Sequence, residues 1–529
     1  MDSVAKKKKK HSFISLLLYS ALTGLVVGLV LYGFKRASVW LVEKMLYIYE
    51  YVQNHLLLIP LLFAGLILMA LTVSYIIKKE PNAGSGAIPR AEGFLRGLIS
   101  FQWFKTTVAT ILSSFLVFFG GLPYGIEGPS VITGTSVAGG VKSLTKADDS
   151  LNRYILTSGA SAGFAIASGS ALAGVVFSLE EMHKRFSFLL LMVSMTGAVF
   201  ASLTIKLLDN LFNTGSIFFP IGYVETLPLN HLWLTVILGI VAGAAASLYN
   251  IILEKVGHFS DGKLKHVSQK IKLIINFVLV GIAGLIVIET LGNGHELIIE
   301  SMSRHYLWTS LLVFLILKVI LITVSIGSGV TGGLFVPSLV VGALIGALIN
   351  ELLIGFGFPG DYTKIIILLS MGAFFATTIS APITTVVFMI EATLDPTNVL
   401  AMIMTILVSM AIAHILKVES INDIVLNRML KKKNSGKEYY IYELTGQVIP
   451  NSFVDQETVR DILWPASTII TTMRRIGDNN HHRMVKNGDK KLKAHDVVVI
   501  QAQTYDLNQT IDELYALMGE QNFTIKLLH

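Results

Sequence analysis

The stretch Gly125-Ile126-Glu127-Gly128-Pro129 begins at the end of residues 106–126, which carry no charged side chain. Proline is favoured in the first turn of a helix, and Gly128 permits a sharp turn before it, so we expect a helix to begin near Pro129. Within a long apolar segment, such a break is tolerated in a membrane only where protein buries it or where it lines a polar cavity. The stretch therefore predicts a helix start at a functional site inside a membrane protein.

A second stretch of the same kind lies 208 residues further on. Gly125 and Pro129 correspond to Gly333 and Pro337 within Gly332-Gly333-Leu334-Phe335-Val336-Pro337. Broken segments at corresponding positions of two halves indicate a binding site at the interface of inverted repeats. Further matches lie at an offset of 211 residues: Val175-Val176-Phe177 and Glu180 match Val386-Val387-Phe388 and Glu391, and Ala162 and Ala165 match Ala373 and Ala376.

Long apolar stretches recur around these two motifs. Hydrophobic residues make up 53% of the 529 residues and charged residues 15%, against about 25% charged in soluble proteins. Because about 20 apolar residues cross a bilayer, we predict an all-α polytopic membrane protein with broken helices. The charge-free stretches are 12–34, 56–77, 106–126, 154–179, 186–205, 226–253, 319–350, 365–390 and 396–416.

Lysines flank the apolar body at positions 6–10 and 431–433. The positive-inside rule then predicts that both termini are cytoplasmic and that the number of crossings is even. The lysines at 6–10 could also be the start of a signal peptide, but the stretch 12–34 is longer than the apolar part of a signal peptide and lacks a clear cleavage site. We therefore expect a multi-pass protein of the cell membrane, and the net charge of +7 does not indicate a nucleic-acid partner.

The composition excludes several kinds of chemistry. The absence of cysteine rules out disulfides, Cys-ligated zinc, iron–sulfur clusters and thiolate catalysis. We find no P-loop, no zinc-ligand spacing and no nucleophile motif, so we expect no enzyme activity, metal or cofactor.

The composition changes after Lys433. From residue 436 onward the chain is dense in charges, with β-like runs at 467–472 and 497–501 and an amphipathic helix at 508–518. We therefore predict four parts: a basic N-terminus over 1–11, a transmembrane domain over 12–430, a linker over 431–435 and a small cytoplasmic α+β domain over 436–529.

Glu127 suggests how an anion and a proton could share one site. Free N–H groups and the positive end of the helix dipole favour an anion at the helix start near Pro129. The ionised Glu127 carboxylate competes for this place, so protonation of Glu127 would release the site. An acid inside a membrane is a functional candidate by default, and the alternative is a carboxylate that reaches the interface or pairs with a cation.

Two further segments offer uncharged donors. The N–H groups of Leu334 and Phe335 follow two glycines that cannot block an approaching anion, and Ser85 presents a hydroxyl between Gly84 and Gly86. Uncharged donors suit transport, because a fixed positive charge would hold the anion too tightly.

In these motifs the chain resembles the CLC family of chloride channels and transporters. The family patterns GSGIP, G(K/R)EGP and GxFxP are matched, in the family order, at residues 84–89, 125–129 and 333–337. The resemblance implies a homodimer, with one chloride pathway and two inverted halves in each subunit.

The resemblance also implies roles for individual residues. Glu127 matches the external gating glutamate, which binds in the anion path and carries protons. Glu180-Glu181-Met182 resembles the helix end where a second glutamate receives protons from the cytoplasm in exchangers, and that position is Glu181. The positions implied to bind the anion are Ser85, Glu127, Gly128, Leu334, Phe335 and Asn422.

The chain departs from the family pattern at two of these positions. An extra residue lies between Ser85 and Pro89, so the local turn must differ. A count without gaps from Glu391 places Asn422 where the family usually has tyrosine. Asparagine still donates a hydrogen bond, but its smaller size would leave the inner gate wider and favour channel-like conduction.

In the C-terminal domain, Pro465 and the runs 469–475 and 494–500 carry a second resemblance. Over about residues 445–520 the domain resembles the ligand-binding subdomain of regulator-of-potassium-conductance proteins. The resemblance implies dimerisation and a possible ligand, cyclic di-AMP, with Arg475 on phosphate and Ile469 and Ile470 against the bases. The alternative is a purely structural dimerisation domain. His481-His482 offers no third ligand and is not proposed as a metal site.

Three functions remain open at this point. Glu127 and Glu181 together favour a proton-coupled chloride antiporter, whereas Asn422 favours a passive chloride channel. The C-terminal domain suggests a potassium transport component, which the lack of a TVGYG-like filter disfavours. Reversal potentials in a chloride gradient, and then in an added pH gradient, distinguish the three.

Overall fold

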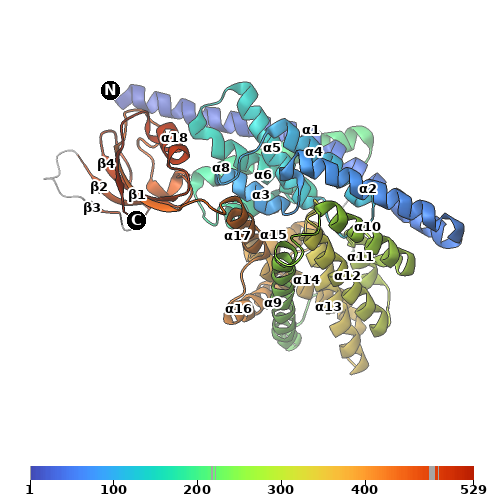
Figure 1. Cartoon of the computed structure of the whole chain (residues 1–529). Helices are drawn as coiled ribbons and strands as arrows, with labels where there is room; N and C mark the ends of the chain where they lie inside the picture. Colours follow the sequence, from blue (N-terminus) through green and yellow to red (C-terminus); the bar gives the residue numbers. More distant parts are fainter. Residues whose placement is uncertain (1, 216–217, 221, 476–482, 486–487, 529) are drawn as a thin grey trace.

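The computed structural model describes residues 2–215, 218–220, 222–475, 483–485 and 488–528, which form a helical body and a small C-terminal domain (Figure 1). Helix α7 continues directly into a π-helical turn, Ser178–Met182. The helices of the first half are α1 (Asp2–Asn54), α2 (Ile59–Lys79), α3 (Ala87–Leu95), α4 (Trp103–Phe119), α5 (Glu127–Thr145), α6 (Asn152–Ser168), α7 (Ala171–Phe177) and α8 (Phe188–Phe212). Those of the second half are α9 (Trp233–Asp261), α10 (Gln269–Ile286), α11 (His295–Ser303), α12 (Trp308–Ser328), α13 (Phe335–Gly355), α14 (Thr363–Ile379), α15 (Pro382–Thr393), α16 (Val399–Leu416) and α17 (Ile421–Lys433).

The predicted apolar stretches overlap these helices, but three of them each extend over two helices: 154–179 over α6 and α7, 319–350 over parts of α12 and α13, and 365–390 over parts of α14 and α15. Among the described residues, nine helices are long and apolar enough to cross a membrane, and α4 and α15 are shorter apolar helices. The first stretch, 12–34, belongs to a single helix that continues past Lys35 and Arg36. The charge pattern does not predict α10, because Lys272 and Glu289 leave only a short charge-free stretch between them.

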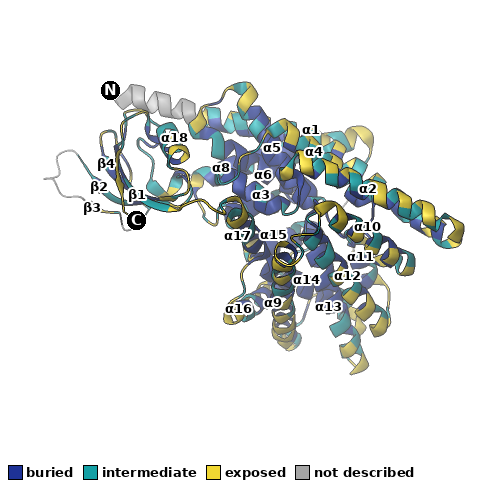
Figure 2. Ribbon diagram, in the orientation of Figure 1, coloured by how far each residue is buried: buried dark blue, intermediate teal, exposed yellow. Residues whose placement is uncertain are grey.

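The outer faces of the body are apolar and exposed. Figure 2 shows exposed residues along α2, α9 and α16, and buried residues in the centre around α5, α6 and α14. The exposed side chains include Leu61 and Leu68 on α2 and Leu400 and Leu407 on α16. Such broad apolar surfaces suit contact with lipid rather than water.

The two broken segments meet at glycines that correspond in the repeat. The N–H of Gly125 donates to the carbonyl oxygen of Gly333 at 3.0 Å, forming an isolated antiparallel bridge. Directly after this bridge, α5 begins at Glu127 and α13 begins at Phe335. The helix start predicted near Pro129 is therefore confirmed to within two residues.

The repeat-related residues Glu180 and Glu391 each cap a helix of the opposite half. The Glu180 carboxylate accepts hydrogen bonds at the start of α15, and the Glu391 carboxylate accepts them at the start of α7. The donors are the N–H groups of Ile383 and Thr384 for Glu180, at 3.0 and 2.7 Å, and of Leu172 and Ala173 for Glu391, at 3.3 and 3.0 Å. Each carboxylate satisfies unpaired N–H groups at a helix start, so the two halves stabilise each other.

The C-terminal domain is a five-stranded antiparallel sheet with one helix, α18 (Leu507–Met518). The sheet order is β3-β2-β4-β1-β5, and the strands are β1 (Tyr440–Gln447), β2 (Thr468–Arg474), β3 (Arg483–Met484), β4 (Val497–Thr504) and β5 (Thr524–Leu527). The predicted β-like runs and the predicted helix are confirmed as β2, β4 and α18. His481 and His482 lie outside the described residues.

The connection between the two parts is mostly helical. Helix α17 runs to Lys433, through most of the linker predicted over 431–435. Phe13 and Leu16, near the start of α1, line a cleft together with Asn451 and Tyr515 of the C-terminal domain. The start of α1 and the C-terminal domain therefore lie at the same end of the body (Figure 1).

Candidate anion and proton site

A buried cavity of about 40 Å³ lies beside the Gly125–Gly333 bridge. Four of the predicted anion-binding residues line it: Ser85, Leu334, Phe335 and Asn422. The volume suffices for a few species of the size of a water molecule. Most other lining residues are apolar or glycine: Gly86, Ala87, Ile88, Pro89, Phe177, Ile326, Gly332, Gly333, Ile379, Ile421 and Val425.

The extra residue after Ser85 is accommodated by a left-handed glycine. Gly86 has φ +73°, and α3 begins directly after it. A Cβ at Gly86 would press against the side chains of Met429 and Val425, and a φ in the left-handed region favours glycine at this position. The Ser85 N–H donates to Gly329 at 3.2 Å, and its carbonyl oxygen accepts from Nε of Arg90 at 2.9 Å. The altered turn therefore still holds Ser85 at the cavity.

Glu127 is buried next to the cavity wall but is not one of its lining residues. Its Oε2 atom folds back over Gly125, lying 2.1 Å from the point that a Cβ of Gly125 would occupy. Within the described part of the chain, this oxygen has no hydrogen-bond partner. Gly128 packs against Gly333, and a Cβ on Gly128 would lie 2.7 Å from the Cα of Gly333. The contact between Gly128 and Gly333 therefore separates the predicted gate residue, Glu127, from the cavity.

Leu334 and Phe335 begin helix α13 at the cavity. Phe335 is the first residue of the helix, so its N–H has no partner within the helix. Its ring packs edge-on against Phe164, Phe375 and Phe388, with ring centroids 5.1, 4.4 and 4.9 Å apart. This packing fixes the helix start that supplies the predicted backbone donors.

Glu181 does not line the cavity, yet one residue connects the two. Glu181 lies in the π-helical turn after α7 and is 2% exposed. The side-chain amide of Asn422, which lines the cavity, donates to Oε1 of Glu181 at 2.7 Å. π-Helical turns are often found at functional sites. The structure therefore joins the predicted proton residue to the predicted anion site through a single hydrogen bond.

Comparison with known proteins is consistent with this architecture. Residues 65–414 match the family model described as "Voltage gated chloride channel". The chain belongs to the CLC family. The curated H(+)/Cl(-) exchange transporters ClcA of Salmonella arizonae and Citrobacter koseri are each 28% identical to it over 435 residues, covering 80% of this chain and 90% of theirs.

Solved CLC structures share its fold. A slow cyanobacterial Cl−/H+ antiporter aligns with a TM-score of 0.73 and 26% identity, covering 79% of this chain and 99% of that chain. A eukaryotic CLC transporter aligns with a TM-score of 0.68 and 18% identity, covering 79% of this chain and 74% of that chain, which shows the fold alone.

Two further polar residues line this CLC cavity, Tyr124 and Arg428, and neither is predicted from the sequence. Tyr124 lies directly before the first broken motif, and its ring covers Gly332 so closely that a Cβ there would be 2.2 Å from Cγ of the tyrosine. Arg428 lies on the same helix as Asn422, and its Nε is 3.4 Å from a carboxylate oxygen of Asp261. In the sequence, Tyr124 directly precedes the motif at 125–129, and Arg428 lies six residues after Asn422. These two positions are the signal that could have identified them. The expectation of a site without fixed positive charge is wrong at Arg428, although Asp261 partly neutralises that charge.

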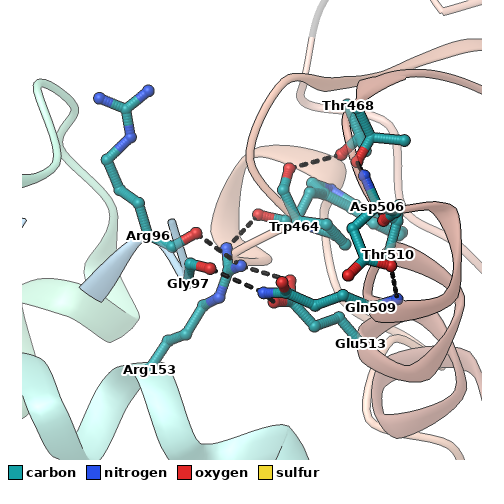
Figure 3. A network of polar contacts seen from close by, with 11 residues as sticks. Arg96, Gly97, Arg153, Trp464, Thr468, Asp506, Gln509, Thr510 and Glu513 are labelled. Carbon is teal, nitrogen blue, oxygen red and sulfur yellow. Dashed lines mark hydrogen bonds and ion pairs between the residues drawn. The ribbon is translucent and has the colours of Figure 1, made fainter. Parts of the chain in front are cut away.

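The C-terminal domain docks on the CLC body through Arg153 at the start of α6. Figure 3 shows its guanidinium between the two parts, donating to the carbonyl oxygens of Arg96 and Trp464 and pairing with Glu513. Gln509 also donates to the carbonyl oxygen of Gly97 at 2.7 Å. Burial at this interface raises the pKa of Glu513, and Arg153 opposes that shift. Arg153 therefore helps to keep the Glu513 carboxylate ionised.

A second set of contacts reaches the segment that follows Glu181. The Tyr154 hydroxyl donates to the carbonyl oxygen of Asp461 at 2.8 Å and accepts from the N–H of Leu463 at 3.0 Å. Arg185, four residues after Glu181, donates to the carbonyl oxygen of Ile462 at 2.7 Å. Leu463 is 6% exposed and packs into the hydrophobic core of the body. The C-terminal domain thus touches the helix end that carries the predicted proton residue.

The predicted ligand residues lie elsewhere, on and after strand β2. Ile469 is 64% exposed, but Ile470 is 5% exposed and belongs to the core of the C-terminal domain. The expectation that both isoleucines cover a base is therefore wrong, because neighbouring strand residues point to opposite faces of the sheet. Arg475 donates to both carboxylate oxygens of Asp496 at 3.1 Å, so phosphate would have to compete with this carboxylate.

Proposed function

We propose that this protein exchanges chloride for protons across the cell membrane. The observation that carries the proposal is a buried cavity with a buried glutamate behind each of two walls, Glu127 behind the Gly128–Gly333 contact and Glu181 behind Asn422. The names of the similar ClcA proteins and of the cyanobacterial antiporter support proton-coupled chloride movement.

Glu127 is the proposed gate. Its carboxylate lies beside the start of α5, where free N–H groups favour an anion. An ionised Glu127 would occupy the place that chloride needs, and a protonated Glu127 would vacate it. Gly128, whose contact with Gly333 leaves no room for a side chain, lets the backbone carry these N–H groups close to the anion.

The other proposed anion contacts are uncharged groups at the cavity, and Arg428, which also lines it, is paired with Asp261. Ser85 would donate through its hydroxyl, and Leu334 and Phe335 through their backbone N–H groups. Apolar walls around a few donors allow an anion to bind and still leave.

A passive chloride channel is the second candidate. Asn422 favours it, because this position usually carries the larger tyrosine in the family and a smaller side chain leaves the cytoplasmic side of the cavity wider. In this reading Glu127 still gates the anion path, but chloride moves without a fixed ratio to protons.

Flux measurements on the protein in liposomes separate the two candidates. For an exchanger, a chloride gradient should drive protons uphill, and an added pH gradient should shift the reversal potential. Glu127→Gln should keep chloride flux and lose proton flux, because a neutral side chain neither competes with the anion nor carries a proton. Chloride flux without any proton movement in the unmodified protein would establish the channel instead. Uphill proton pumping by Glu127→Gln would refute the gating role.

We further propose a homodimer with cytoplasmic termini. The lysines at 431–433 favour the cytoplasm by the positive-inside rule. The cleft shared by Phe13, Leu16 and the C-terminal domain supports a common side for both ends of the chain. Cross-linking in native membranes tests the dimer, and protease access to the C-terminal domain in right-side-out vesicles tests the orientation.

Residues 436–529 are proposed to regulate transport. Their contacts with Tyr154 and Arg185, close to Glu181, give a route by which a change in the domain can bias the proton path. A ligand acts through such a route only if it binds more tightly to one functional state. The proposed ligand is cyclic di-AMP, with Ile469 and Arg475 as its remaining candidate contacts. Titration calorimetry on the full-length protein, beside Arg475→Ala, tests it, and the absence of heat and of any thermal shift would leave a structural dimerisation domain.

A further inference from the structure

Asn422 combines two properties that no other residue of the described chain combines. It lines the anion cavity, and it is hydrogen-bonded to the buried Glu181 carboxylate. Its amide nitrogen carries two hydrogens, so it can donate in two directions. At 7% exposure, the side chain has little contact with solvent to satisfy it otherwise. The position that the family usually fills with tyrosine therefore reaches the proton residue directly in this chain.

The surroundings of Glu181 make this hydrogen bond important. The charged groups that face Glu181 are Lys184 after the π-helical turn, Glu92 on α3 and Asp423 on α17. Glu92 is paired with Arg96 at 2.9 Å, and Lys184 is paired with Asp423. Among the residues that the structure describes, Asn422 is the one side chain hydrogen-bonded to the Glu181 carboxylate. A hydrogen bond from a neutral donor favours the ionised form of a carboxylate.

We propose that Asn422 couples chloride in the cavity to the protonation of Glu181 by sharing its amide between them. With the cavity free of chloride, the amide serves the ionised carboxylate. Chloride in the cavity accepts from the second N–H of the amide and draws the side chain away from Glu181, and its negative charge also repels the carboxylate. Both effects favour the uptake of a proton by Glu181. The proton comes from the aqueous solution, where it leaves hydronium, and it adds to a carboxylate oxygen of Glu181. This inference rests on the proposed function, because it assumes that chloride binds in this cavity.

The coupling has a definite sign. If chloride binding promotes proton uptake, then linkage requires that protonation strengthens chloride binding by the same factor. Chloride affinity should therefore rise as the pH falls through the titration of Glu181. Coupling between two sites of one protein is typically about fivefold or more in affinity. A tyrosine at this position has no amide group to donate to both partners. We therefore expect this coupling with asparagine and not with tyrosine.

Equilibrium binding tests the inference without transport. Chloride is titrated calorimetrically into the full-length Glu127→Gln protein in two buffers of different ionisation enthalpy, which gives the protons taken up per chloride bound. The Glu127→Gln background removes the other titrating glutamate of the site. We expect proton uptake, and a chloride affinity at least about fivefold higher at low pH than at high pH.

Added substitutions in this background assign the effect. Glu181→Gln and Asn422→Leu should each abolish proton uptake and reduce the pH dependence to less than about twofold. Asn422→Tyr should also lose the pH dependence while restoring a donor to the cavity, and it serves as the second variant if Asn422→Leu does not fold. Ser85→Ala is the matched control, because Ser85 lines the same cavity without touching Glu181, and it should weaken chloride binding equally at every pH.

The outcomes are distinct. Proton uptake that persists in Asn422→Leu or Asn422→Tyr would overturn the role of Asn422. Loss of proton uptake in Ser85→Ala would mean that any change in the cavity has this effect, and would overturn it as well. No chloride binding in any variant would refute the proposed function itself, together with this inference.

Discussion

The backbone N–H of Gly125 donates to the carbonyl oxygen of Gly333, and these two glycines occupy the same position in the two halves of the chain. The contact brings the start of α5 and the start of α13 to one cavity. A Cβ on Gly333 would lie 2.6 Å from the backbone nitrogen of Gly128. Because both partners are backbone atoms, neither can move aside without displacing a helix start.

Gly333→Ala should therefore separate the two helix starts. We expect a loss of roughly 1–3 kcal/mol in the free energy of unfolding, typical of overpacking, together with weaker chloride binding. Thermal unfolding in detergent and chloride calorimetry measure the two effects. Gly65→Ala on α2 is the control, because nothing lies within 4 Å of a Cβ there and alanine is the better helix former. If the two variants had the same stability and the same chloride affinity, the close contact at Gly333 would be contradicted.

Glu180→Gln and Glu391→Gln should lower stability by similar amounts. Each substitution removes a negative charge from the start of a helix in the opposite half, an effect of about 0.5–2 kcal/mol. Thermal unfolding of each variant measures it. Glu254→Gln removes the charge of a partly exposed glutamate within α9, away from any helix start, and should have little effect. A loss of stability for only one of the two caps would contradict the reciprocal arrangement.

Arg153→Met should loosen the C-terminal domain from the body, because two carbonyl oxygens and one carboxylate depend on its guanidinium. A double-mutant cycle with Glu513→Gln should give a coupling energy of about 1–3 kcal/mol for this half-buried pair. Hydrogen exchange at residues 461–464 measures the free energy needed to separate the C-terminal domain from the body. The Arg460–Asp489 pair, whose side chains are 62% and 60% exposed, is the matched control. A coupling as small as that of the control would show that the pair does not hold the interface.

Tyr124→Phe should weaken chloride binding roughly three- to tenfold, the loss expected for one hydrogen bond. The phenyl ring keeps its packing on Gly332, so stability should change little. Tyr49→Phe is the control, because Tyr49 is equally buried in the same hydrophobic cluster and does not line the cavity. Unchanged chloride affinity in Tyr124→Phe would mean that its hydroxyl does not face the anion.

Much of the fold could be predicted from the sequence, because its signals are local. Charge-free stretches long enough for a bilayer indicate membrane helices, and the glycines and prolines at 125–129 and 332–337 mark where two helices begin. The change in composition after Lys433 separates the C-terminal domain, and its alternating pattern predicts two of its strands. The same signals fail for α10, whose charge-free part is too short to stand out.

Only the tertiary structure decides which of these segments meet. Asn422 and Glu181 are 241 positions apart, and their hydrogen bond depends on the packing of α17 against the π-helical turn after α7. The sequence of either segment alone does not predict that it contacts the other. The same holds for Arg153, whose contact with the C-terminal domain no feature of its own segment indicates. Local propensities set where a helix begins and which residues are apolar, but the relative position of two helices is fixed by side chains that both contribute, and a single sequence does not record how those side chains fit together.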